Sequence, residues 1–183
     1  MLDPKDLRRT VIIENVAPVV DGGRYPVKRE VGDRIEVSAD VFKEGHDVLA
    51  AFVKYRRADE PDWRESPMRF VDNDRWAGAF TVEDNAHYRY TIEALPDPFR
   101  SWLADLAKRV AADQDVASEL REGAALVQAA AGRATGDDAV ALGEWLGDRV
   151  GDSTPRGLVA GAVVAGALAP ALTLIRRRPP ATG

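Results

Sequence analysis

The sequence contains no cysteine and only two histidines, His46 and His87. Without cysteine, neither a disulfide framework nor a thiolate metal site can form, which is compatible with a reducing compartment. Two histidines leave few candidates for the base of a Ser-His-Asp triad or for a metal ligand. His46 lies in the polar run Glu44–Asp47, which predicts a solvated turn. His87 is predicted on the polar face of a strand beside Arg89 and Glu93.

Several catalytic and binding motifs are also missing. There is no GxxxxGK[ST] loop, no HExxH and no EF-hand loop, and the run Asp72–Asp74 is too short to ligate calcium alone. Thirty acidic residues provide many accidental carboxylate pairs, and nothing in the sequence selects one of them for glycoside chemistry. We therefore predict no catalytic, cofactor-binding or metal-binding residue. The formal net charge of -5 argues against a nucleic-acid partner.

Long apolar runs are scarce as well. Leu158–Ile175 has no charged residue and is followed by three arginines, as in a marginal membrane span. It consists mostly of Ala, Gly and Val, contains Pro170 and has no aromatic belt, which favours a buried or partner-facing helix pair. A tail anchor remains the less favoured alternative. Met1–Thr10 carries charges of both signs and does not resemble a secretory signal, so we expect a cytoplasmic protein.

From Thr10 to Ala94, apolar residues recur with a period of two. The runs RIEVSADV (34–41), LAAFVKY (49–55) and HYRYTIEA (87–94) each place apolar side chains on one face, as half-buried strands do. Turn residues separate six or seven such strands, which predicts an immunoglobulin-like antiparallel β-sandwich over residues 1–95. Trp63, Trp76 and Phe80 are expected to be core or cross-strand packing residues, and the alternative for the tryptophans is a sugar-stacking platform.

After Ala94 the apolar period becomes helical. Asp97 and Pro98 predict a helix start whose inner stripe holds Phe99, Trp102, Leu103, Leu106 and Val110. A second helix is expected from about Asp115 to Ala131, with an inner stripe of Val116, Leu120, Ala124 and Val127. A third is expected from about Asp137, and the run from Leu158 would supply a fourth. The fold class is thus α+β: a sandwich, then a bundle of three to four helices over residues 96–178, then a disordered tail at 179–183.

The segment Val20–Asp33, VDGGRYPVKREVGD, permits two interpretations. Gly22, Gly23 and Arg24 with Lys28 could form an anion-binding nest, although no helix start follows to add its dipole. Asp21 and the glycines could instead supply the backbone angles of a tight turn, and this structural interpretation is favoured.

A series of motifs in a fixed order resembles the N-terminal region of the bacterial maltose-1-phosphate maltosyltransferases, which belong to the α-amylase superfamily of glycoside hydrolases. The series is VxPxVDGGRYPVKRxxGD, ADVFKEGHDVLAAFVKYR, DWRESPM, NDRWAGAF, YRYTIEA, DPFRSWLADLAKR and QDVASELREGAAL. The similarity is continuous from Thr10 to Val127 and loosens after Gly132. Leu95 and Pro96 stand where the family usually has an aromatic residue.

The resemblance implies a retaining transfer of maltosyl units from α-maltose 1-phosphate to the non-reducing ends of α-1,4-glucans. It also implies a sandwich and an inserted helical bundle that form a homodimer, with the catalytic carboxylates in a (β/α)8 barrel. A barrel takes about 250 residues, so the chain is expected to be an inactive N-terminal fragment, from which no catalytic residue can be assigned. A stand-alone carbohydrate-binding or protein-interaction module is the alternative.

Overall fold

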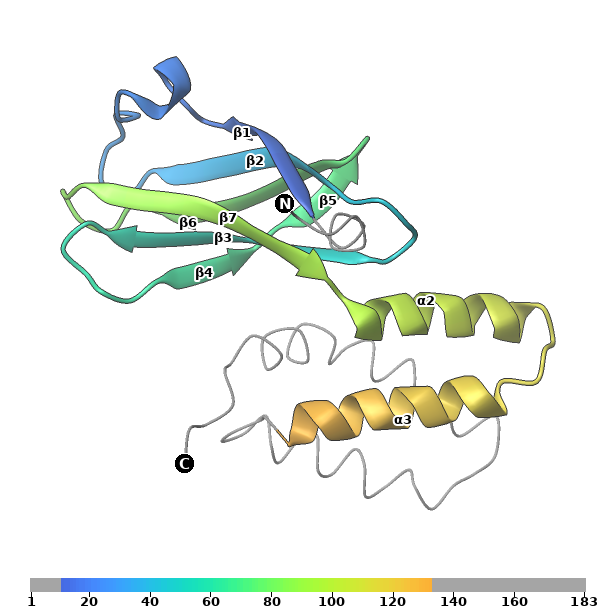
Figure 1. The fold of residues 1–183 in the computed structure, drawn as a ribbon. Helices are drawn as coiled ribbons and strands as arrows, with labels where there is room; N and C mark the ends of the chain where they lie inside the picture. Colours follow the sequence, from blue (N-terminus) through green and yellow to red (C-terminus); the bar gives the residue numbers. More distant parts are fainter. Residues whose placement is uncertain (1–10, 133–183) are drawn as a thin grey trace, which may run out of the picture. The chain divides into compact units, whose positions relative to one another are not determined.

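A computed structural model describes residues 11–132 of the 183-residue chain (Figure 1). The helix expected near Asp137, the run Leu158–Ile175 and the tail 179–183 lie outside the described residues. The chain divides into two compact units, Met1–Pro96 and Asp97–Gly183, and each is described by itself.

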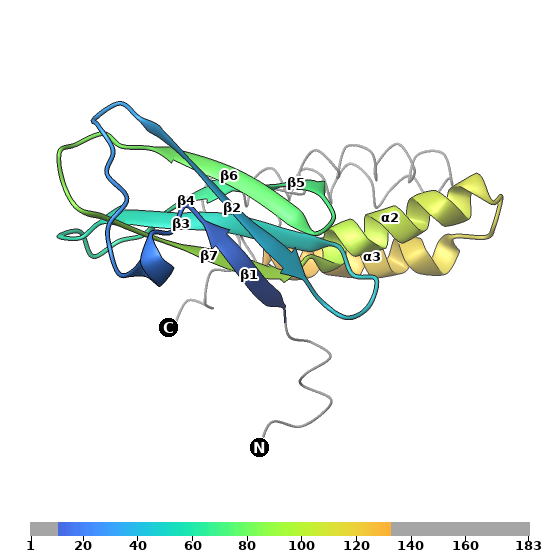
Figure 2. The ribbon, with the colours of Figure 1, turned by 90° about the horizontal axis from the view of Figure 1, so that it is seen from above.

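The described residues of the first unit, 11–96, form seven strands in two antiparallel sheets (Figures 1 and 2). One sheet has the order β1 (Ile12–Ala17), β2 (Arg34–Phe42), β6 (Arg75–Thr81), β5 (Arg69–Asp72). The other has the order β4 (Arg64–Pro67), β3 (Leu49–Arg57), β7 (Tyr88–Pro96). Together with the helices of the second unit, these sheets confirm the α+β class.

The core of the first unit lies between the two sheets. From β2 it takes Ile35, Val37, Ala39 and Val41, the alternate residues that the period-two pattern selects. Tyr55 of β3 stacks on Phe80 of β6 with ring centroids 4.5 Å apart, so aromatic contact also joins the sheets. Burial of these apolar faces is the main stabilising contribution to a sandwich of this kind.

The three aromatic residues that were predicted to pack in the core or across strands differ in their positions. Trp76 and Phe80 are buried, as predicted. Trp63 is 39% exposed, so of the two expected positions, core or cross-strand packing, the core is excluded for it. It precedes β4 and lies outside the alternating pattern, and the Arg56 guanidinium sits 4.8 Å from its ring centroid. A cation over the ring face substitutes for core packing at this position.

Backbone angles explain two of the predicted turns. Asp21–Gly23 forms a short 3-10 turn, η1, in which Asp21, Gly22 and Gly23 all have positive φ. Val20 and Tyr25 bridge across it. Asn73 and Asp74 also have positive φ and connect β5 to β6, as expected for the two central residues of a tight hairpin.

The described part of the second unit is a pair of helices, α2 (Pro98–Ala111) and α3 (Ala117–Ala131). The Asp97 carboxylate accepts a hydrogen bond from the Arg100 backbone N–H at 2.9 Å, which confirms the predicted cap. None of the described helices is long and apolar enough to cross a membrane.

The inner stripes of both helices are narrower than predicted. Phe99, Trp102 and Leu106 of α2 are buried, whereas Val110 is 37% exposed. On α3, Ala124 is exposed and Gly123 is buried in its place. A Cβ on Gly123 would lie 2.0 Å from the Trp102 ring, so this position accepts the indole only because it is glycine.

Candidate functional site

A groove of about 750 Å³ lies in the first unit between β7 and the segment formed by β1 and residues 18–29. β1 contributes Ile13 and Val16, and β7 contributes Tyr88, Tyr90 and Ile92. All five side chains are partly buried and pack against the core. Arg29 and Arg89 are exposed and line the same groove. The groove is therefore apolar along its floor and cationic at its margin.

Tyr90 holds the two sides of the groove together. Its hydroxyl donates a hydrogen bond to the Pro18 carbonyl, across the space between β7 and the segment that follows β1. Burial raises the pKa of Tyr90, because the phenolate would lose hydration there. The hydroxyl therefore remains a neutral donor throughout the physiological pH range.

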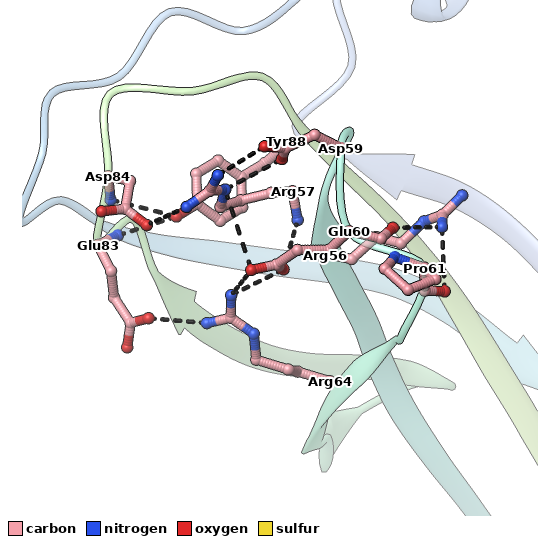
Figure 3. Close-up of polar contacts among 9 residues, drawn as sticks. All are labelled: Arg56, Arg57, Asp59, Glu60, Pro61, Arg64, Glu83, Asp84 and Tyr88. Atoms are coloured by element: carbon pink, nitrogen blue, oxygen red, sulfur yellow. Dashed lines mark hydrogen bonds and ion pairs between the residues drawn. The ribbon is translucent and has the colours of Figure 1, made fainter.

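A charged cluster lies at one end of the sandwich, where the β3–β4 turn meets the β6–β7 turn (Figure 3). Arg57 binds Asp59 at 2.6 Å and Asp84 at 3.0 Å. Arg64 binds Glu60 at 2.9 Å and Glu83 at 2.7 Å. Two arginines therefore each connect one turn to the other.

Tyr88 completes this cluster from the first residue of β7. Its hydroxyl oxygen accepts hydrogen bonds from the backbone N–H groups of Glu83 and Asp84, at 3.3 and 3.2 Å (Figure 3). The same ring lies against Phe80, so the side chain connects the turn to the core.

The ionisation of the cluster follows from its ion pairs. The hydrogen bond with Arg64 is the main cause that lowers the pKa of Glu60, and the hydrogen bond with Arg57 is the main cause for Asp59. Those carboxylates raise the pKa of both guanidinium groups in return. A general acid requires a carboxyl that holds its proton near neutral pH, and these pKa shifts run in the opposite direction. The geometry fits a fixed structural contact.

The two histidines are not brought together. His46 is exposed in the bend after β2, as expected. His87 is not within the strand as predicted but immediately precedes it, is exposed, and accepts a hydrogen bond from the Ala58 backbone N–H through its carbonyl oxygen. Among residues 11–132, no group of three or more His, Asp or Glu side chains is placed to hold a metal ion.

Hydrogen bonds within the turn at Asp21–Gly23 occupy backbone N–H groups that an anion-binding nest would need. The Gly23 backbone N–H donates to the Val20 carbonyl, and that of Arg24 donates to the Asp21 carbonyl, both at 3.1 Å. The Arg24 guanidinium lies 3.9 Å from the Asp21 carboxylate. These contacts support the structural interpretation of the segment.

Sequence reasoning missed the groove. It assigned Tyr88, Tyr90 and Ile92 to one buried face, which is correct. It did not indicate that a groove would lie beside these residues at the edge of the sheet. No signal in the sequence indicated the groove, because residue periodicity does not give the order of the strands in a sheet.

Comparison with known proteins shows which family this sequence resembles. The family model described as "Alpha-1,4-glucan:maltose-1-phosphate maltosyltransferase, domain N/S" matches residues 9–182. An enzyme of that name from Myxococcus xanthus is 54% identical over 143 residues, covering 74% of this chain and 22% of the relative.

Two further maltosyltransferases show the same partial overlap. The one from Chlorobaculum tepidum is 43% identical, covering 79% of this chain and 22% of the relative. The one from Salinibacter ruber is 39% identical, covering 74% and 21%. The chain thus spans about a fifth of the length of these curated relatives. With a matched family model over nearly its whole length, the chain belongs to the α-1,4-glucan:maltose-1-phosphate maltosyltransferase family, in the region of domain N/S.

Proposed function

We propose that this chain is the structural, dimerising N-terminal part of a maltosyltransferase and does not carry the catalytic carboxylates. The enzyme would transfer maltosyl units from α-maltose 1-phosphate to the non-reducing ends of α-1,4-glucans, in the cytoplasm. The observation that carries the proposal is the family match over residues 9–182, combined with the 22% share of the Myxococcus xanthus relative. The ion-paired carboxylates of the charged cluster support a structural role.

The strand order supports the finer description of the fold as immunoglobulin-like. In that fold, one sheet has the order A-B-E-D and the other contains C beside F. The order β1-β2-β6-β5 reproduces the first sheet, and β3 beside β7 reproduces the second. The proposal extends the α2–α3 pair to a bundle of three to four helices over residues 96–178.

Phosphate release tests the proposal that the chain alone does not catalyse maltosyl transfer. Transfer of a maltosyl unit breaks the bond between its anomeric carbon and the phosphate oxygen, so each turnover releases one phosphate. The purified chain, incubated with maltose 1-phosphate and glycogen, should release none, while the Myxococcus xanthus enzyme serves as the positive control. Steady release that depends on the chain's concentration would refute the proposal.

The proposed dimer is tested separately by sedimentation equilibrium. A homodimer should give twice the 19.9 kDa chain mass over a wide concentration range. A single species of monomer mass at the highest attainable concentration would refute the dimerising role of this part, while leaving the phosphate-release result unaffected.

A carbohydrate-binding module is the second candidate, because Tyr25 and Trp63 line the groove with 56% and 39% of their surfaces exposed. Exposed aromatic rings can stack on sugar rings. Titration with maltoheptaose, followed by tryptophan fluorescence, should then saturate in the native chain and fail in Trp63→Ala. A flat response in the native chain at millimolar glucan would remove this candidate.

A further inference from the structure

A hollow of about 240 Å³ lies over β6 in the four-stranded sheet. β6 stands between β2 and β5 (Figure 2). Arg34 and Glu36 of β2 line the hollow on one side, and residues 66–69 line it on the other. Ala77 and Ala79 of β6 form its floor, which is recessed because their side chains are single methyl groups. The volume is below the range of about 300–1,000 Å³ that suits drug-sized ligands, so the hollow fits a small molecule.

The charged side chains of the hollow share one face of the sheet. The register pairs Glu36 with Ala79 and Arg69 with Ala77, and cross-strand partners lie on the same face. Arg34 is two residues before Glu36 in β2 and lies on that face as well. The face is turned away from the core, because the alternate residues of β2 are those that pack between the sheets. All three charged groups therefore flank the recessed floor.

These three groups are not neutralised within the sandwich. The side chains of Arg34, Glu36 and Arg69 are exposed, and none of them makes an ion pair or a hydrogen bond with another residue of the described range 11–132. On the same sheet, by contrast, the Arg75 guanidinium binds the Asp40 carboxylate at 2.9 Å. Two guanidinium groups and one carboxylate thus keep their capacity to bind a ligand beside one floor.

We propose that this hollow binds a small phosphate ester that carries hydroxyl groups. Guanidinium groups present pairs of N–H donors that match the oxygens of a phosphate, and two of them offset the charge of the dianion. The Glu36 carboxylate only accepts hydrogen bonds, so it repels a bare phosphate but accepts a hydrogen bond from a hydroxyl group. The Ser66 hydroxyl lines the same hollow and can donate or accept. This combination favours a hydroxylated ester over free phosphate.

Titration of the 183-residue chain with glucose 6-phosphate, followed by the NMR signals of its backbone amides, tests this binding. The signals of Ala77 and Ala79 should shift saturably, while that of Tyr90, in the groove beside β7, should not. Inorganic phosphate and glucose should each bind about tenfold more weakly or less, because each lacks one of the two recognised groups. No saturable shift with glucose 6-phosphate at millimolar concentration would overturn the proposal, as would equal affinity for either of the other two compounds.

Variants separate the hollow from a general attraction of anions to the surface. Arg34→Gln and Arg69→Gln should each weaken binding about tenfold or more, because each removes charge-assisted hydrogen bonds to the phosphate. Arg89→Gln is the matched control, since Arg89 is exposed on β7 outside the hollow, and it should bind as the native chain does. Equal affinity of the control and the two hollow variants would overturn the assignment.

A substitution on the floor tests the shape of the hollow without changing its charge. Ala79→Leu fills the recess and should weaken binding of glucose 6-phosphate about tenfold or more. Unchanged affinity would show that only surface charge attracts the ligand and would overturn the proposal. Binding here is independent of the proposed function, because it breaks no bond. Phosphate release by the chain from maltose 1-phosphate would refute the proposed function and leave these shifts unchanged, so the two failures can be told apart.

Discussion

The sandwich and the helix pair bury their apolar surface in different ways. The sandwich packs residues of five strands from two sheets between its faces, and two turns at one end are joined by ion pairs. The described helices share one stripe, in which the Trp102 indole lies on Gly123 and donates to the Glu119 carbonyl at 2.6 Å. A distributed core spreads the effect of a substitution over many neighbours, whereas a single stripe depends on a few close contacts.

The largest expected effect on stability comes from a substitution in the core of the sandwich. Phe80→Ala removes a ring that is 6% exposed and touches Tyr55, Tyr88 and Tyr90. We expect the free energy of unfolding of the sandwich to fall by about 3–5 kcal/mol. Urea unfolding monitored by hydrogen exchange in each region measures it, with Phe70→Ala, 55% exposed on β5, as the control. Equal acceleration of exchange in the helix pair would show that the two regions unfold as one.

The next effect concerns the single stripe. Gly123→Ala improves helix propensity but places a Cβ 2.0 Å from the Trp102 ring, which must move. We expect a net loss of about 1–3 kcal/mol in the stability of the helix pair, measured by thermal unfolding. Gly132→Ala is the matched control, because its Cβ would meet its nearest atoms at 3.7 Å. A Gly123→Ala protein as stable as that control would contradict the close packing.

The helix cap is expected to contribute less than the stripe. Asp97→Ala removes the acceptor for the Arg100 N–H and should reduce the stability of α2 by about 1 kcal/mol. Asp97→Asn keeps a side-chain oxygen in the same place and should recover most of the loss. Circular dichroism at 222 nm during thermal unfolding compares the two, and identical curves for Ala and Asn would show that the cap hydrogen bond does not stabilise the helix.

The smallest expected effect is a pH dependence of stability that arises in the sandwich. Arginine pairing lowers the pKa of Asp59 and Glu60 in the folded sandwich. Between the ordinary and the lowered pKa values, the unfolded chain binds more protons than the folded chain, so stability falls as the pH falls through that window. Arg64→Gln should make the acid transition of the sandwich shallower, whereas Arg69→Gln, at an exposed position on β5, should leave it unchanged. Indistinguishable acid transitions of the two variants would contradict the role of the cluster.

The sandwich and the helix pair also differ in how much of their structure the sequence could predict. The core face of β2 was predicted correctly because a period of two permits only two answers, and Ile35 to Val41 follow it strictly. In β3 the alternation was wrong, since Ala50 and Phe52 on the opposite face are buried as well. The inner stripe of α3 was predicted wrongly at Ala124. A search for apolar residues passes over Gly123, which is buried because only glycine leaves room for the Trp102 ring. For Trp63 the sequence left core and cross-strand packing open, because composition does not show that Arg56 would cover its ring.

The candidate site was less predictable than the fold. The charged cluster joins Arg57 to Asp84 and Arg64 to Glu83, residues brought close only by the meeting of two turns. No local spacing indicates such pairs. The groove depends on which strand lies at the edge of a sheet, and this is a property of strand order that residue periodicity does not encode.

We propose that residues 11–132 supply structure and leave the chemistry to the rest of a maltosyltransferase. The most direct measurement is phosphate release by a chimera in which residues 11–132 replace the aligned part of the Myxococcus xanthus enzyme. We expect the chimera to have the kcat and KM of the parent enzyme for maltose 1-phosphate, because no reacting group is exchanged. A chimera that unfolds cooperatively at the parent's temperature but releases no phosphate would contradict it.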